Sequence, residues 1–187
     1  RAHGAFPAAL DELDRAYRRY TESGQPPAAG LALAERGDIL RIQGAYAEAE
    51  AAYERAATYG HDPQPGRALL WLAKGRTAAA AGAVRRLLQE AGNPVQRSRL
   101  LPAGVEVLLA DGAVDEARSA MEEMSAIAES IGSTALRAAA AHSAGCVHVA
   151  SGDAAGALPH LRLSWRLWTV LDSPYEAARA RVAMGRV

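Results

Sequence analysis

Glycine-centred breaks recur along this sequence, and each one separates two segments whose apolar residues follow helical periodicity. The breaks at Gly44, Gly75, Gly112 and Gly152 are 31, 37 and 40 residues apart. These intervals bracket the period of about 34 residues that is typical of repeats built from two helices. One pair of helices cannot bury its own apolar stripe, so neighbouring pairs have to stack. The sequence therefore predicts an all-α chain of stacked antiparallel helix pairs.

Residues 37–63 contain the clearest break. Apolar residues recur three and four positions apart on both sides of Gly44, and Asp62-Pro63 stops the second helix. Small residues allow the two helices to approach closely, and tyrosines fill the space beside them. The segment resembles a tetratricopeptide repeat at Gly37, Leu40, Gly44, Tyr46, Ala49, Tyr53, Ala56 and Pro63, with Leu33 in place of an early aromatic residue. The resemblance implies a right-handed α-α superhelix with a concave groove.

Applied to the whole chain, the same pattern gives one tetratricopeptide-like array over residues 1–187. We expect the second helix of a truncated repeat at about 1–22, helix pairs at 28–60, 65–92, 96–132 and 134–171, and the first helix of a further truncated repeat at 174–187. Ser173 to Glu176 has the composition of an N-cap followed by a capping box. Because the chain lacks an initial Met and both ends fall within predicted helices, we expect it to be a fragment whose flanking domains are absent.

Composition limits the functional classes. Twenty-one Lys and Arg against twenty-one Asp and Glu give no net charge, which offers no electrostatic reason to bind a phosphate backbone. The single cysteine, Cys146, rules out an internal disulfide. The sequence shows no signal peptide and no run of about 18 apolar residues. We therefore expect a cytoplasmic protein that contacts neither nucleic acid nor membrane by itself.

Three phrases carry a second resemblance: DPQPG at 62–66, LSWRLW at 163–168 and SPYEAAR at 173–179. Together with the repeats, they resemble the tetratricopeptide-like region of actinobacterial transcriptional regulators of the LuxR type. The resemblance implies an interaction or sensor module that contacts a protein partner or other domains of the same regulator, with a homo-oligomer also possible. It further implies a DNA-binding helix-turn-helix domain beyond Val187 and places any ATPase module before Arg1.

The repeat template places eight side chains on the face that lines the groove. They are Asp38, Arg41, Arg99, Glu106, His142, Cys146, Arg179 and Arg186. Arginine forks and carboxylates on one face can bind a peptide or a small ligand. A solvated helix face with incidental ion pairs is the alternative, and the sequence alone favours it.

His142 and Cys146 stand four residues apart, which raises the question of a zinc site. Structural zinc requires four ligands and paired motifs such as C-x2-C, which the sequence lacks, so we predict no metal and no cofactor. Cys146 is interpreted as a small buried residue and His148 as a partly buried packing residue. Met121 and Met124, with Trp165 and Trp168, continue apolar stripes and are assigned to the core rather than to an open apolar groove.

No catalytic motif is present: we find no nucleophile elbow, no P-loop, no H-E-x-x-H and no dinucleotide-binding glycine motif. We therefore expect no catalytic residues and a non-enzymatic docking module. The first alternative is a groove that binds a small-molecule inducer, which a concave pocket lined by Arg99, Glu106, His142 and Arg179 would favour. The second is an enzyme whose active site assembles from dispersed residues.

Overall fold

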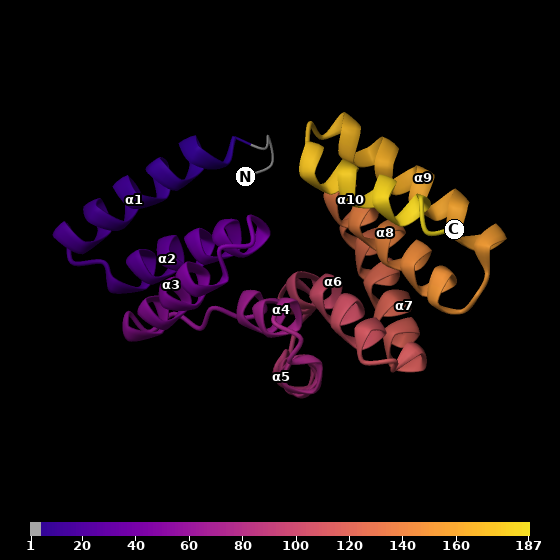
Figure 1. Ribbon diagram of the computed structural model, residues 1–187, viewed down its shortest axis with the longest axis horizontal. Coiled ribbons are helices and arrows are strands. Elements are labelled where there is room, and N and C mark those ends of the chain that lie inside the picture. The colour runs from indigo at the N-terminus through magenta and orange to yellow at the C-terminus, as the bar shows by residue number, and fades with distance from the viewer. Residues whose placement is uncertain (1–4) are drawn as a thin grey trace. The chain divides into compact units, whose positions relative to one another are not determined.

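The computed structural model describes residues 5–187, which form ten α-helices and no strand (Figure 1). The helices are α1 (Phe6–Glu22), α2 (Pro26–Ile42), α3 (Tyr46–Thr58), α4 (Gly66–Ala73), α5 (Thr77–Glu90), α6 (Pro94–Ala110), α7 (Val114–Ile131), α8 (Thr134–Ala150), α9 (Ala154–Val170) and α10 (Pro174–Met184). The predicted all-α class is confirmed. Within the described part of the chain, no helix is long and apolar enough to cross a membrane.

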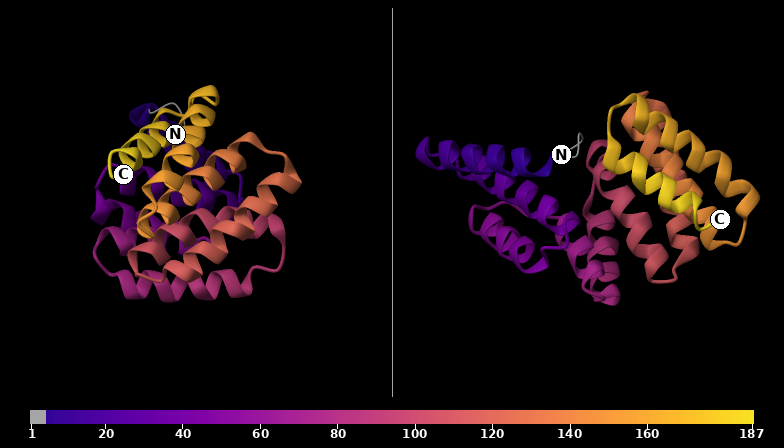
Figure 2. Two further views of the ribbon diagram at one scale, coloured as in Figure 1. Left: turned by 90° about the vertical axis from the view of Figure 1, so that its right-hand side faces the viewer. Right: turned by 45° about the horizontal axis from the view of Figure 1, so that its top comes forward.

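The described residues divide into two compact units, 5–76 with α1–α4 and 77–187 with α5–α10. In the first unit, α1 packs on α2, α2 on α3, and α4 on both α2 and α3. In the second, each helix from α5 to α10 packs on the next, and α8 also contacts α6 and α10 (Figure 2). The predicted pair at 65–92 is divided by the boundary between the units, and the assembly of all pairs into one array stays a prediction.

All four predicted breaks lie between consecutive helices. Their glycines, Gly44, Gly75, Gly112 and Gly152, have φ angles of 81°, 74°, 77° and 75°. This left-handed conformation ends a helix readily and is costly for residues that carry a Cβ. Glycine is thus required at each turn by backbone geometry.

A tyrosine organises the core of the first unit. Tyr53 on α3 is buried among Leu40, Ala49, Ala52 and Leu70, and its ring presses against Gly37 on α2. A Cβ at Gly37 would lie 2.5 Å from Tyr53 Cε1, which confirms that a small residue there permits close helix approach. The Tyr53 hydroxyl donates to Asp38 Oδ1 at 2.8 Å, so its polar end is satisfied inside the core.

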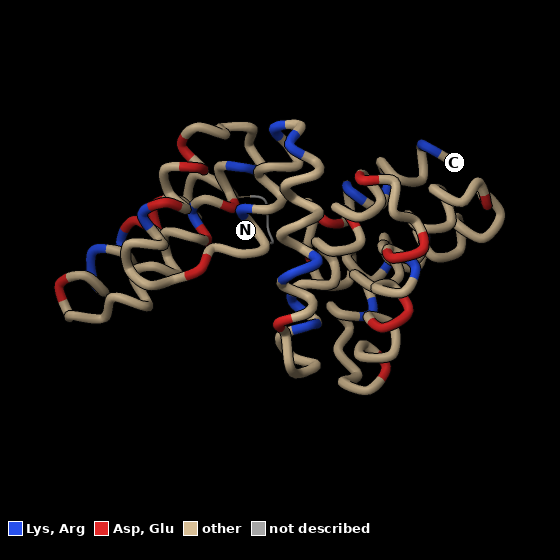
Figure 3. The backbone as a smooth tube through the Cα atoms, turned by 90° about the horizontal axis from the view of Figure 1, so that it is seen from below, with Lys and Arg blue, Asp and Glu red and all other residues tan. Residues whose placement is uncertain are grey.

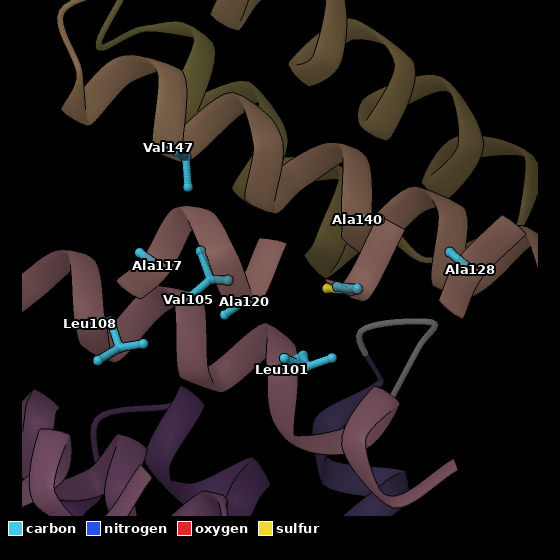
Figure 4. Packing of buried hydrophobic residues seen from close by; sticks show 9 residues of the cluster. Leu101, Val105, Leu108, Ala117, Ala120, Ala128, Ala140 and Val147 are labelled. Carbon is cyan, nitrogen blue, oxygen red and sulfur yellow. The ribbon is translucent and has the colours of Figure 1, made fainter. Parts of the chain in front are cut away.

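Three helices build the main core of the second unit. Leu101, Val105 and Leu108 of α6 face small side chains of α7 and α8, as Figure 4 shows. The remaining members of this cluster are Ala117, Ala120, Met124, Ala128, Ala140 and Val147. The abundance of alanine lets the helix backbones pack closely, so α6, α7 and α8 form one layered body.

Several local expectations need correction. Trp165 is 39% exposed and is therefore not a core residue, whereas Met124 is 1% exposed as predicted. Ser173 forms no side-chain cap hydrogen bond, so the predicted capping box is wrong.

Gly145→Ala and Gly82→Ala form a matched pair that tests the close approach of α8 and α9. A Cβ at Gly145 would lie 2.4 Å from Leu161 Cδ2, whereas a Cβ at Gly82 would meet nothing within 4 Å. We expect Gly145→Ala to destabilise the chain by about 1–3 kcal/mol through overpacking. Gly82→Ala should stabilise it by about 0.5–1 kcal/mol, since it improves helix propensity without a clash. Urea unfolding measures both, and equal effects of the two changes would contradict the packing argument.

Candidate functional site

Four of the predicted groove residues converge on one face of the second unit. Glu106 lies on α6, His142 and Cys146 on α8, and Arg179 on α10. Arg179 Nη2 donates to Glu106 Oε2 at 2.6 Å, although the residues are 73 positions apart in the sequence. This ion pair links α6 to α10, the two helices that both contact α8. We call this surface the α6–α8–α10 face.

Arg179 is held by two carboxylates. Its Nη1 donates to Glu176 Oε2 at 3.1 Å, one helical turn away on α10. Burial lowers the pKa of Arg179, but the carboxylates of Glu106 and Glu176 outweigh it and leave the pKa above its ordinary value. The side chains of Arg179 and Glu106 are 34% and 43% exposed, so solvent screens the pair and limits it to about 1 kcal/mol.

His142 and Cys146 lie close to this ion pair. Cys146 Sγ and His142 Nε2 are 3.5 Å apart, one turn from each other on α8. Burial, followed by the nearby Arg179 guanidinium, lowers the pKa of His142 to about 4. Burial also raises the pKa of the Cys146 thiol. Both groups are therefore neutral at pH 7, and the thiol is the natural donor to Nε2.

The neutral pair is not a catalytic arrangement. A nucleophilic cysteine needs a lowered pKa and a cationic partner, whereas Cys146 has a raised pKa beside a neutral imidazole. His142 Nδ1 is buried and has no hydrogen-bond partner among residues 5–187. A buried imidazole nitrogen without a partner costs about 1–3 kcal/mol.

Arg186 and Arg99 are the two remaining predicted groove residues of the second unit. The Arg186 guanidinium is near enough to contribute to lowering the pKa of Cys146, against the dominant effect of burial. Arg99 is exposed on α6, seven residues before Glu106. Neither arginine forms an ion pair within residues 5–187. Both guanidiniums thus remain accessible to a ligand.

Asp38 and Arg41 belong to the first unit and have a different environment. Arg41 Nη2 lies 3.5 Å from Asp38 Oδ1, the same oxygen that accepts the Tyr53 hydroxyl. A Cβ at Gly66, the first residue of α4, would lie 2.5 Å from Asp38 Oδ1. These contacts tie α2, α3 and α4 together, so within its unit Asp38 has a structural role.

Glu176 is the residue of the face that sequence reasoning assigned to another role. The sequence pattern placed it in a capping box, but its carboxylate accepts from Arg179 instead. The signal was its position three residues before Arg179, which puts both side chains on one side of α10. Glu176 accepts a hydrogen bond from Nη1 of Arg179, while Nη2 of the same guanidinium donates to Glu106.

A recess lies in the second unit between α5, α6 and α7, with a volume of about 370 Å³. Leu88, Leu101 and Leu108 contribute to its apolar lining. Its two arginines are already engaged: Arg85 bonds Asp111 and Glu116, while Arg97 bonds Glu123 and the carbonyls of Leu88 and Ala91. Arg97 thereby ties the end of α5 to α6 and α7, which indicates a structural role for this region.

The remaining histidines give no metal centre. His148 is partly buried, as predicted; its Nδ1 lies 2.8 Å from Asp153 Oδ2, and its ring stacks on His160 with centroids 5.3 Å apart. Across residues 5–187 there is no group of three or more His, Cys, Asp or Glu placed to hold a metal ion.

No protein-family model and no curated protein matches the sequence. The geometry of the α6–α8–α10 face therefore carries the functional argument.

His142→Leu tests the burial of the imidazole through the pH dependence of stability. Because the folded pKa is about 4 and the ordinary value is 6.5, the unfolded state binds more protons between these values. The unmodified chain should lose on the order of 3 kcal/mol through this group as pH falls from 6.5 to 4. His142→Leu should lack this loss, and at pH 7 it should be neutral or slightly stabilising.

Urea unfolding at several pH values makes the comparison. The carboxylates with lowered pKa values, such as Glu116 and Glu123, lose their contribution in both proteins at lower pH and therefore cancel. Parallel stability curves for the two proteins between pH 6.5 and 4 would show that His142 is not buried as described.

Proposed function

We propose that this chain is a helical-repeat docking module that binds a protein segment along the α6–α8–α10 face. The observation that carries the proposal is the ion pair between Glu106 and Arg179, which brings side chains of two non-adjacent helices together over the same face as His142. The partly exposed Glu106 and Arg179 charges, beside the half-buried His142 and Cys146, can bind polar groups of a partner. In our proposal, the helix pairs stack as a tetratricopeptide-like right-handed superhelix.

Recognition fits this chemistry better than catalysis does. His142 and Cys146 are neutral at pH 7, and Arg179 is constrained by two carboxylates. A general base or an activated nucleophile needs a pKa matched to proton transfer near the working pH. The groups on this face are shifted away from that range, so we assign them to binding.

The proposed setting is a cytoplasmic transcriptional regulator of the LuxR type. The phrases at 62–66, 163–168 and 173–179 support this setting by resemblance. The net charge of zero agrees with a module that leaves DNA binding to a helix-turn-helix domain outside these residues. The partner of this module would be another protein or another domain of the same regulator.

Lys and Arg are interspersed with Asp and Glu in each unit, as Figure 3 shows.

A small-molecule inducer is the alternative occupant. The proximity of Glu106, His142 and Arg179 favours it, because three polar groups from three helices could orient a compact ligand. Such a ligand would transmit a signal only if it bound two conformations with different affinity. Arg99, which the sequence placed in the same pocket, shows no contact with these groups.

Selection from a random displayed-peptide library tests the docking proposal. Peptides selected on the unmodified chain should bind at least tenfold more weakly to Arg179→Ala, since a central side chain of the face is removed. Arg181→Ala is the matched control, because Arg181 is an exposed arginine on the same helix and forms no ion pair within residues 5–187. Circular dichroism verifies that each variant is folded, and fluorescence anisotropy measures affinity.

The outcome that contradicts docking on this face is a set of peptides that bind all three proteins equally. A parallel thermal-shift screen with a metabolite library addresses the alternative. A compound that raises the unfolding midpoint with dose, and loses this effect in Arg99→Ala and Arg179→Ala, would favour the inducer proposal.

A further inference from the structure

We infer that the occupant of the α6–α8–α10 face is an acidic peptide segment whose carboxylate displaces Glu106 from Arg179. The inference rests on the proposed docking function and specifies the chemistry of the partner. In the free chain, Glu106 occupies the position that the carboxylate of the partner takes in the complex. Glu106 is thus an internal competitor for the site.

The geometry of Arg179 supports such an exchange. Glu176 holds Nη1 from the same helix at 3.1 Å, so the guanidinium stays in place when Nη2 changes partner. Nη2 meets Glu106 Oε2 at 2.6 Å, the short distance of a charge-assisted hydrogen bond. The Glu106 side chain is 43% exposed, so an incoming carboxylate can reach the position that it occupies.

The energy of the internal pair also permits displacement. Partly exposed ion pairs contribute little to stability, because solvent screens them and two long side chains must be ordered. A partner that supplies the same carboxylate from a chain with further contacts can exceed this contribution. The same pair slightly disfavours ligands that offer Arg179 no negative charge.

The two accessible arginines extend the site along the face. Arg99 precedes Glu106 by seven residues on α6, and Arg186 follows Arg179 by seven residues, just beyond the end of α10 at Met184. Seven helical residues span about 10 Å. Since α6, α8 and α10 run in broadly the same direction (Figure 1), the start of α6 and the end of α10 lie toward opposite ends of the face.

The spread of the arginines along the face favours a ligand with several carboxylates. An extended chain rises about 3.3 Å per residue, so acidic residues at every third position present a carboxylate about every 10 Å. The face holds Arg99, Arg179 and Arg186 against Glu106 and Glu176, which leaves one positive charge in excess. Charge complementarity therefore favours an acidic segment over a basic partner.

Fluorescence anisotropy with a designed probe tests the inference on the whole chain. The probe is a fluorescein-labelled peptide of Gly and Ser with Glu at every third position, and its control carries Gln at those positions. We expect the Glu peptide to bind at least tenfold more tightly than the Gln peptide. Glu106→Gln should tighten binding of the Glu peptide by about two- to fivefold, because the internal competitor loses its charge.

Two further variants locate the effect. Arg179→Gln should abolish binding of the Glu peptide, whereas Arg181→Gln, on the same helix but outside any ion pair within residues 5–187, should leave it unchanged. Circular dichroism and thermal unfolding confirm that all variants are folded. A single-stranded oligonucleotide of equal charge serves as the second anionic probe and should bind at least tenfold more weakly.

The inference is overturned if Glu106→Gln binds the Glu peptide no more tightly than the unmodified chain does. Equal binding of the Gln peptide, equal binding of the oligonucleotide, or failure of the Glu peptide to bind also overturns it. Library peptides that lack acidic residues but depend on Arg179 would preserve the docking function while rejecting this partner chemistry. Failure of both experiments would reject the docking function itself.

Discussion

Close approach of paired helices is the constraint on which the rest of the structure depends. At Gly37 and Gly145, a Cβ would lie 2.5 Å and 2.4 Å from the side chain of the next helix, Tyr53 or Leu161. Each large side chain therefore occupies the space that a glycine leaves open. Because the Tyr53 and Leu161 side chains pack directly against the backbone at Gly37 and Gly145, the register of each helix pair is fixed there. That register decides which residues of α2 and α8 face away from their partner helix.

On α8, the outward positions after this packing are those of His142 and Cys146. α8 contacts α6 and α10 as well as α7 and α9, so its outward face forms a floor between two helices. Such a position is only partly hydrated, which explains why the pKa of His142 falls to about 4. Arg179 lies near both groups, and the charge of its guanidinium further lowers the pKa of His142.

Repeat periodicity allowed much of this face to be predicted. A template register placed Glu106, His142, Cys146 and Arg179 on one side of their helices, and the structure brings them together. The breaks were equally predictable, because a left-handed turn residue is nearly always glycine. Both features depend on local spacing, which the sequence displays directly.

Features that depend on longer-range partners were not predictable in the same way. Asp38 was assigned to a groove, and its hydrogen bond from the Tyr53 hydroxyl, fifteen residues away, is not visible in local spacing. Glu176 has the spacing of a capping residue, and only the position of Arg179 on the same turn draws its carboxylate elsewhere. Trp165 follows an apolar stripe, yet its exposure depends on how far the neighbouring helices extend over α9.

The strength of the Glu106–Arg179 pair also bears on the choice between docking and sensing. A ligand that breaks this pair changes the link between α6 and α10 by at most the free energy of the pair, about 1 kcal/mol. A coupling of that size alters an equilibrium by about fivefold. A strong conformational switch between states populated 1:99 and 99:1 requires about 5.5 kcal/mol. The pair is therefore suited to selecting which partner binds, and it contributes too little by itself to drive a large change of conformation.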